Sequence, residues 1–145
     1  MTSSDPFNLQ RFIDAQGDVY ESALAELREG DKKSHWMWFI FPQLAALGRS
    51  PTAKFFGLAS IDEARAYLAH PLLGPRLREC VEALLSWSGS RSAERILGSI
   101  DAMKLRSSLT LFDLIEPDGL MGQGLLNFFS GDRDELSLAL LHHRH

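Results

Sequence analysis

The sequence lacks most of the features that usually narrow the range of functions a protein could have. Its 145 residues include one cysteine, Cys80, so no disulfide can form within the chain. The N-terminal residues lack the basic and apolar regions of a signal peptide, and we therefore expect a cytoplasmic protein. The longest continuous apolar run covers only residues 36–41, whereas roughly 20 apolar residues are needed to cross a bilayer. We predict no membrane insertion.

An excess of positive charge is also missing. The formal net charge is −4 at pH 7 and the pI is about 5.7, so the chain has no general attraction for phosphate backbones or anionic membranes. Nucleic acid is therefore not an expected partner. The sequence contains no phosphate-binding Gly-x-x-x-x-Gly-Lys loop, Gly-x-Ser-x-Gly elbow or His-Glu-x-x-His zinc motif. The sequence therefore indicates no particular cofactor or metal site and no familiar class of hydrolase or kinase.

Length and composition fit one folded domain. Chains of roughly 150 residues bury about 68–70% of their unfolded surface without disulfides or metals. Hydrophobic residues make up 45% of this chain and charged residues 23%, as in ordinary globular proteins. We predict a single helical domain over residues 1–145, with frayed ends at 1–4 and 142–145.

Helix signals recur along the chain, with short breaks and no βαβ alternation. The predicted helices start at Asp5-Pro6, cover 18–28, run from Ser60 to His70, follow Gly74-Pro75, cover 92–97 and 99–115, and start within 132–135. Capping boxes are expected at Asp18 and Ser60, and His70 should cap helix carbonyls. Apolar residues scatter around most of the 99–115 helix, which predicts a central, buried helix. The expected fold is all-α.

The most unusual stretch is aromatic. Residues 36–41 contain Trp36 and Trp38 and are followed by Pro42. One large aromatic side chain buries about 150–250 Å², so this segment should hold a large share of the core. Periodicity does not separate a strand from a buried helix here.

Residues 33–43, which read Lys-Ser-His-Trp-Met-Trp-Phe-Ile-Phe-Pro-Gln, resemble the signature of the domain-of-unknown-function 1810 family, some members of which are called calpastatin. Further stretches that agree with this family are residues 63–68, His70-Pro71, residues 73–77 and residues 101–112. The resemblance covers nearly the whole chain. It implies a compact helical fold and brings no established activity.

Two polar groupings are candidates for a site. Asp101, Lys104 and Ser108, spaced i, i+3 and i+7, share one side of the predicted central helix among apolar neighbours. A carboxylate and an ammonium in such surroundings either form an ordinary ion pair or await a ligand. His35 could act as a general base or contact an anion beside Lys33, because imidazole titrates near neutral pH.

The alternatives for the aromatic segment stay open at this stage. Trp36 and Trp38 could stack on a planar ligand, or they could be core residues with His35 as a hydrogen-bonded spacer. For Gln43 the same two alternatives stay open, a ligand contact or a structural residue.

The sequence favours a small-molecule pocket, for an anionic or planar ligand, where the aromatic segment meets the central helix. The predicted binding residues are Lys33, Ser34, His35, Trp36, Gln43, Asp101, Lys104 and Ser108, with His35 as the candidate catalytic residue. Whether a reaction is catalysed is left open. The rival hypothesis is an interaction module, which predicts no cleft near His35 and an exposed apolar patch for a protein partner.

Overall fold

The computed structural model describes residues 5–117 and 119–142. The fraying predicted at 1–4 and 142–145 falls outside these ranges except at His142, which is the last residue of the final helix. Within them the chain forms ten α-helices and one 3-10 helix, η1. Extended pairing is limited there to an isolated parallel bridge between Leu44 and Leu58. The predicted all-α fold is confirmed.

The helices follow one another with short connections. In the first half they are α1 (Gln10–Gln16), α2 (Tyr20–Glu29), α3 (Met37–Ile40), η1 (Ala45–Leu47), α4 (Pro51–Phe55) and α5 (Ile61–Ala69). In the second half they are α6 (Leu73–Leu85), α7 (Ala93–Leu97), α8 (Ser99–Ile115), α9 (Leu120–Phe129) and α10 (Glu135–His142). None of the described helices is long and apolar enough to cross a membrane.

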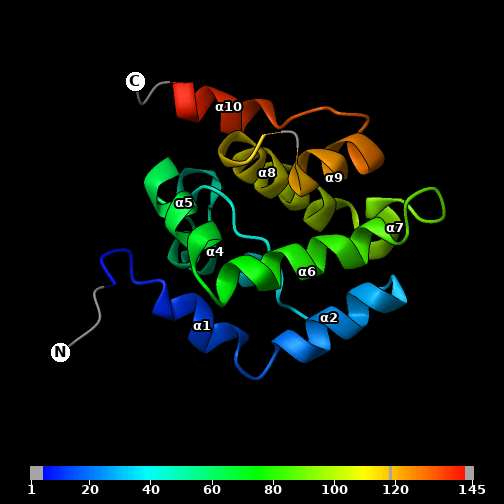
Figure 1. Ribbon diagram of the computed structural model, residues 1–145, viewed down its shortest axis with the longest axis horizontal. Coiled ribbons are helices and arrows are strands. Elements are labelled where there is room, and N and C mark those ends of the chain that lie inside the picture. Colours follow the sequence, from blue (N-terminus) through cyan, green and yellow to red (C-terminus); the bar gives the residue numbers. More distant parts are fainter. Residues whose placement is uncertain (1–4, 118, 143–145) are drawn as a thin grey trace.

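Helix α8 is the centre of the fold. It packs against α5, α7, α9 and α10, while α6 packs against α2, α5 and α9. In Figure 1, α6 crosses the middle of the molecule, with α1 and α2 on one side and α8, α9 and α10 on the other. The scattered apolar residues of α8 predict this position. Enclosure is incomplete, however, because Ile100 and Met103 in its first turns are 71% and 64% exposed.

The aromatic segment is a short helix rather than a strand. Trp36, Met37, Ile40 and Phe41 are buried in and around α3. The segment ends before Pro42, where the chain becomes extended and the Leu58 N–H donates to the Gln43 carbonyl at 2.9 Å. The aromatic core therefore lies between α1, which packs on α3, and the extended stretch leading to η1.

Two predicted helix starts are wrong. Helix α1 begins at Gln10 instead of Asp5, because Asn8 takes a left-handed conformation (φ 53°) that interrupts the helix. The Asp5 carboxylate instead accepts hydrogen bonds from the Leu9 and Gln10 N–H groups at 2.8 and 3.0 Å. Helix α2 begins at Tyr20, and no side chain caps its N-terminus, so the capping box expected at Asp18 does not form.

The start of α5 is as expected, and the role of His70 differs. Ser60 Oγ accepts the Glu63 N–H at 3.2 Å, as the capping box predicts. His70 does not cap the carbonyls of α5. Its Nδ1 accepts the N–H groups of Leu72 and Leu73, at 3.1 and 3.3 Å, so this imidazole caps the start of α6.

Candidate functional site

The start of the aromatic segment is held by a carboxylate from α2. Glu26 Oε1 accepts the Lys33 N–H, the Ser34 N–H and the Trp36 indole N–H at 2.7, 3.0 and 2.8 Å, and Oε2 accepts the Ser34 hydroxyl at 2.6 Å. Burial raises the pKa of Glu26, but these hydrogen bonds outweigh it and hold the pKa at about 2. Glu26 therefore fixes this stretch as a charged anchor.

A chain of charges joins the aromatic segment to α8. The Asp101 carboxylate lies between two lysines, with Lys32 Nζ 3.0 Å from Oδ2 and Lys104 Nζ 3.4 Å from Oδ1. Each ammonium also lies over an indole: Lys32 Nζ is 5.0 Å from the Trp36 ring centroid and Lys104 Nζ is 4.3 Å from that of Trp38. The two segments singled out in the sequence are thus in contact.

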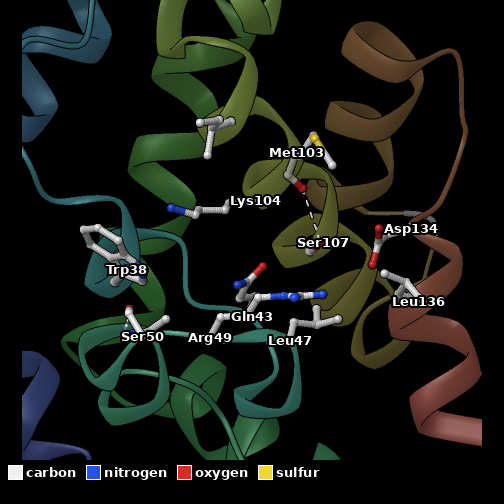
Figure 2. Close-up of a pocket in the computed structure, with 13 residues that line it drawn as sticks. Trp38, Gln43, Leu47, Arg49, Ser50, Met103, Lys104, Ser107, Asp134 and Leu136 are labelled. Atoms are coloured by element: carbon white, nitrogen blue, oxygen red, sulfur yellow. Dashed lines mark hydrogen bonds between the residues drawn. The ribbon is translucent and has the colours of Figure 1, made fainter.

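An open pocket of about 430 Å³ lies next to this contact. Its walls come from four parts of the chain: the aromatic segment with Trp38 and Gln43, residues 47–50 and Ala53 around η1 and α4, the first turns of α8, and the start of α10. Figure 2 shows the side chains of Trp38, Gln43, Arg49 and Lys104 around one space. We call it the Trp38 pocket.

The charged groups of the Trp38 pocket are mostly cationic. Arg49 has no ion pair or hydrogen bond with any other residue that the structure describes, and Lys104 shares Asp101 with Lys32. The Asp134 carboxylate, which also lines the pocket, already accepts the N–H and hydroxyl of Ser137, at 2.9 and 2.6 Å. The pocket therefore offers two cations whose charge is incompletely compensated.

The apolar wall and the rim complete the site. The indole N–H of Trp38 is buried without a hydrogen-bond partner within the described residues. Ile100, Met103 and Leu136 line the pocket and are 71%, 64% and 67% exposed, respectively. A ligand in this pocket would contact apolar surface that is otherwise open to water.

The residues predicted from the sequence fall into three places. Gln43 and Lys104 line the Trp38 pocket, and Asp101 holds Lys104. Lys33, Ser34 and His35 are exposed and do not line it. Trp36 and Ser108 are fully buried, and Ser108 Oγ has no hydrogen-bond partner in the part of the chain that the structure describes.

Sequence reasoning missed several residues of this region. Arg49 lies in a Gly-Arg-Ser-Pro stretch that signals only a surface loop, and Asp134 looks like a helix cap, which it also is. Glu26 resembles an ordinary charged residue of an amphipathic helix, and Lys32 resembles a loop lysine. Their partners, Trp36 for Glu26 and Asp101 for Lys32, carry no local signal that would reveal these contacts. Among the described residues, no group of three or more His, Cys, Asp or Glu side chains could hold a metal ion.

The described residues form an all-α protein with a buried aromatic segment and a cationic, aromatic-walled pocket at the edge of α8. The chain belongs to the family described as "Protein of unknown function (DUF1810)", whose model matches residues 6–141, and the resemblance seen in the sequence is confirmed.

A solved structure agrees with this fold. The chain is similar to the conserved hypothetical protein Rv1873 from Mycobacterium tuberculosis, with 47% identity and a TM-score of 0.91 to its crystal structure. The match covers 95% of this chain and 99% of that one. Comparison with curated proteins gave no significant match.

Proposed function

We propose that the Trp38 pocket binds a small organic anion, a carboxylate or phosphate with an apolar or planar part. The observation that carries this proposal is the presence of Arg49 and Lys104 on one pocket, with Arg49 lacking any partner within the described residues. A guanidinium and an ammonium are the side chains that proteins use most to bind such groups.

The local charge supports an anionic ligand. Lys32, Lys104 and Asp101 together carry one net positive charge, and Arg49 adds a second. Asp134 faces Arg106 at 4.0 Å, so its charge is partly compensated. A positive pocket on a chain with a net charge of −4 favours the entry of anions at this point over other points of the surface.

The size and walls suggest what the rest of the ligand looks like. Small-molecule pockets usually measure about 300–1,000 Å³, and this one of about 430 Å³ suits a ligand of metabolite size. Trp38, Leu47 and Met103 would contact its apolar part, and the Gln43 amide could donate to or accept from a polar substituent. No imidazole or thiol lies among the described residues that line the pocket, so we propose binding and assign no reaction.

A titration of the wild type with a panel of organic carboxylates and phosphates tests the proposal, read by calorimetry and thermal shift. Lys104→Gln and Arg49→Gln should each weaken a hit about tenfold or more, because a hydrogen bond to a charged group contributes roughly 1.5–3 kcal/mol. Arg95→Gln, an exposed cation on α7, is the matched control. The proposal fails if no anion binds, or if Arg95→Gln weakens binding as much as the pocket variants.

His35→Ala separates the pocket from the site predicted by the sequence. If His35, Lys33 and Lys104 formed one site, His35→Ala and Lys104→Ala would both abolish binding. Because His35 does not line the Trp38 pocket, we expect His35→Ala to retain wild-type affinity. Each variant's own melting temperature serves as its reference, so a loss of stability is not read as a loss of binding.

The exposed rim favours a second candidate function, the docking of a protein partner. Ile100, Met103 and Leu136 are exposed large apolar side chains at one pocket mouth, and such clusters mark interaction surfaces. Met103→Glu would then abolish capture of the partner. A small anion that binds the wild type but leaves partner capture unchanged would assign the two activities to different surfaces.

A further inference from the structure

A second hollow lies where α8, α9 and the loop before α10 meet, and it shares no lining residue with the Trp38 pocket. Its volume is about 500 Å³. Its lining includes Asp113, Gly122, Gln123, Leu125, Leu126 and Arg133. We call it the Asp113 hollow.

Asp113 is a buried carboxylate with one oxygen in use. The residue is 3% exposed, and its Oδ2 accepts the Arg133 guanidinium at 2.5 Å. Its Oδ1 is buried and has no hydrogen-bond partner within the described residues. Since buried charged acceptors are costly to leave unpaired, this oxygen calls for a donor.

The residue that packs next to that oxygen has no side chain. Gly122 lies beside it in the first turn of α9, and a Cβ at Gly122 would be 2.8 Å from Asp113 Oδ1. Any side chain at this position would therefore crowd the free oxygen. Both residues line the hollow, and glycine at position 122 leaves Oδ1 without a side chain from that residue packed against it.

The same protein shows which group suits such a carboxylate. On the same helix, Asp101 places one oxygen on the ammonium of Lys32 and the other on that of Lys104. Asp113 has a cation on one oxygen only, Arg133. By analogy with Asp101, a second positively charged N–H donor would suit Oδ1.

We propose that the Asp113 hollow binds a primary ammonium group, which donates to Asp113 Oδ1. The alkyl part attached to it would lie against Leu125 and Leu126, of which Leu126 is 64% exposed and gains burial. The Gln123 side chain, whose amide oxygen is an acceptor, is placed to take a second N–H of the ammonium. The shared chemistry fits a free amine or the lysine side chain of a partner.

The experiment is an NMR titration of the full chain that follows the backbone amides of Gly119, Gly122 and Gly131, which line the hollow. n-Butylammonium should shift these signals saturably, with a dissociation constant of about 1–10 mM, the range expected for one charge-assisted contact and a short alkyl chain. Tetramethylammonium has the same charge and no N–H, and should leave them unchanged. The proposal is overturned if n-butylammonium gives no saturable shift or if both cations act alike.

Variants locate the site. Asp113→Asn removes the charge, Gly122→Ala places a methyl group against Oδ1, and both should weaken n-butylammonium at least fivefold. Asp132→Asn, an exposed acid in the adjacent loop, is the matched control and should bind as the wild type does. Equal weakening by Asp132→Asn would overturn the assignment to Asp113, and the comparison of the two ammonium probes in the wild type decides the question if a variant fails to fold.

A capped pentapeptide with one central lysine distinguishes the two sources. If it shifts the same glycine signals at least tenfold more tightly than n-butylammonium, the hollow serves a lysine of a partner protein. If the two bind alike, or the peptide binds more weakly, a free amine is the ligand.

Discussion

Glu26 offers the sharpest test of how the aromatic segment is held. Glu26→Ala removes the acceptor of the Lys33 and Ser34 N–H groups and of the Trp36 indole N–H. The buried indole donor would cost about 1–3 kcal/mol when unpaired, whereas water can replace the acceptor of the two exposed backbone donors, which adds about 1 kcal/mol. We expect a loss of about 2–4 kcal/mol in the free energy of unfolding.

Glu26→Gln separates the hydrogen bonds from the charge. Glutamine keeps an oxygen where Glu26 Oε1 accepts its three N–H groups. It loses the negative charge, and its NH2 group replaces Oε2, so the Ser34 hydroxyl must accept from this group instead of donating to it. The loss at pH 7 should be about 1–2 kcal/mol, because hydrogen bonds to charged acceptors are roughly twice as strong as neutral ones. Glu29→Gln is the matched control, since Glu29 lies on the same helix with only an exposed ion pair to Lys33 at 3.5 Å.

The dependence on pH gives a second, independent readout. The pKa of Glu26 is lowered from 4.5 to about 2, so the folded protein favours the ionised carboxylate. Its contribution is complete above pH 4.5 and is lost as the pH falls from 4.5 towards 2. The difference in unfolding free energy between wild type and Glu26→Gln should therefore shrink over this window, by about 1–2 kcal/mol after allowance for solvent screening.

The assay is urea denaturation, followed by tryptophan fluorescence, at several pH values from about 7 down to about 3. This range includes part of the window over which the contribution of Glu26 is lost. A Glu26→Ala variant as stable as Glu29→Gln would refute the anchoring role of this carboxylate. A wild-type to Glu26→Gln difference that stays constant down to the lowest pH would refute the lowered pKa.

Three further predictions concern other parts of the core. Trp38→Phe should cost no more than about 1.5 kcal/mol in urea denaturation, because the loss of ring area is accompanied by removal of an indole N–H that has no partner among the described residues. Asp101→Asn should cost about 2–3 kcal/mol, since it leaves Lys32, whose side chain is 9% exposed, without its counter-charge, and a double variant with Lys32→Met should recover most of the loss. Burial raises the pKa of the Cys80 thiol to about 12, so the folded protein should resist alkylation at about pH 8, which is close to the pKa of an ordinary thiol. Protein unfolded in urea should react at this pH, and rapid labelling of the folded chain would contradict the burial of Cys80.

The sequence predicts elements well where the signals are local. Helix α8 runs over residues 99–115 as expected, because Gly98 precedes it and Pro117 follows it. Ser60 caps α5 for an equally local reason, because its Oγ accepts the N–H of Glu63 three residues later. Asp5 and Asp18 carry the same kind of signal and start no helix, because Asn8 and the turn after Gly17 redirect the chain. A capping residue thus predicts a turn more safely than the helix that should follow it.

The site was less predictable, because its contacts join residues far apart in the sequence. Lys104 of α8 lies over the Trp38 indole of the aromatic segment, but the sequence does not signal that Lys32, which looks like a loop lysine, pairs with Asp101 beside this contact. Likewise, Arg49 becomes a candidate ligand contact only when the loop before α4 folds against the start of α8. No periodicity or spacing encodes such a meeting of two loops and a helix.

The two halves of the signature stretch 33–43 have different structural roles. In its first half, Lys33 and Trp36 donate hydrogen bonds to the Glu26 carboxylate, and Trp36 is buried. These contacts fix where α3 begins. Its second half presents Trp38 and Gln43 to the pocket, with Lys104 over the Trp38 indole. Changes in the first half should therefore act on stability, and reach a ligand only by moving α3. Changes in the second half should act on binding while the fold persists, and measuring both quantities for Ser34→Ala and Gln43→Ala would show whether the division holds.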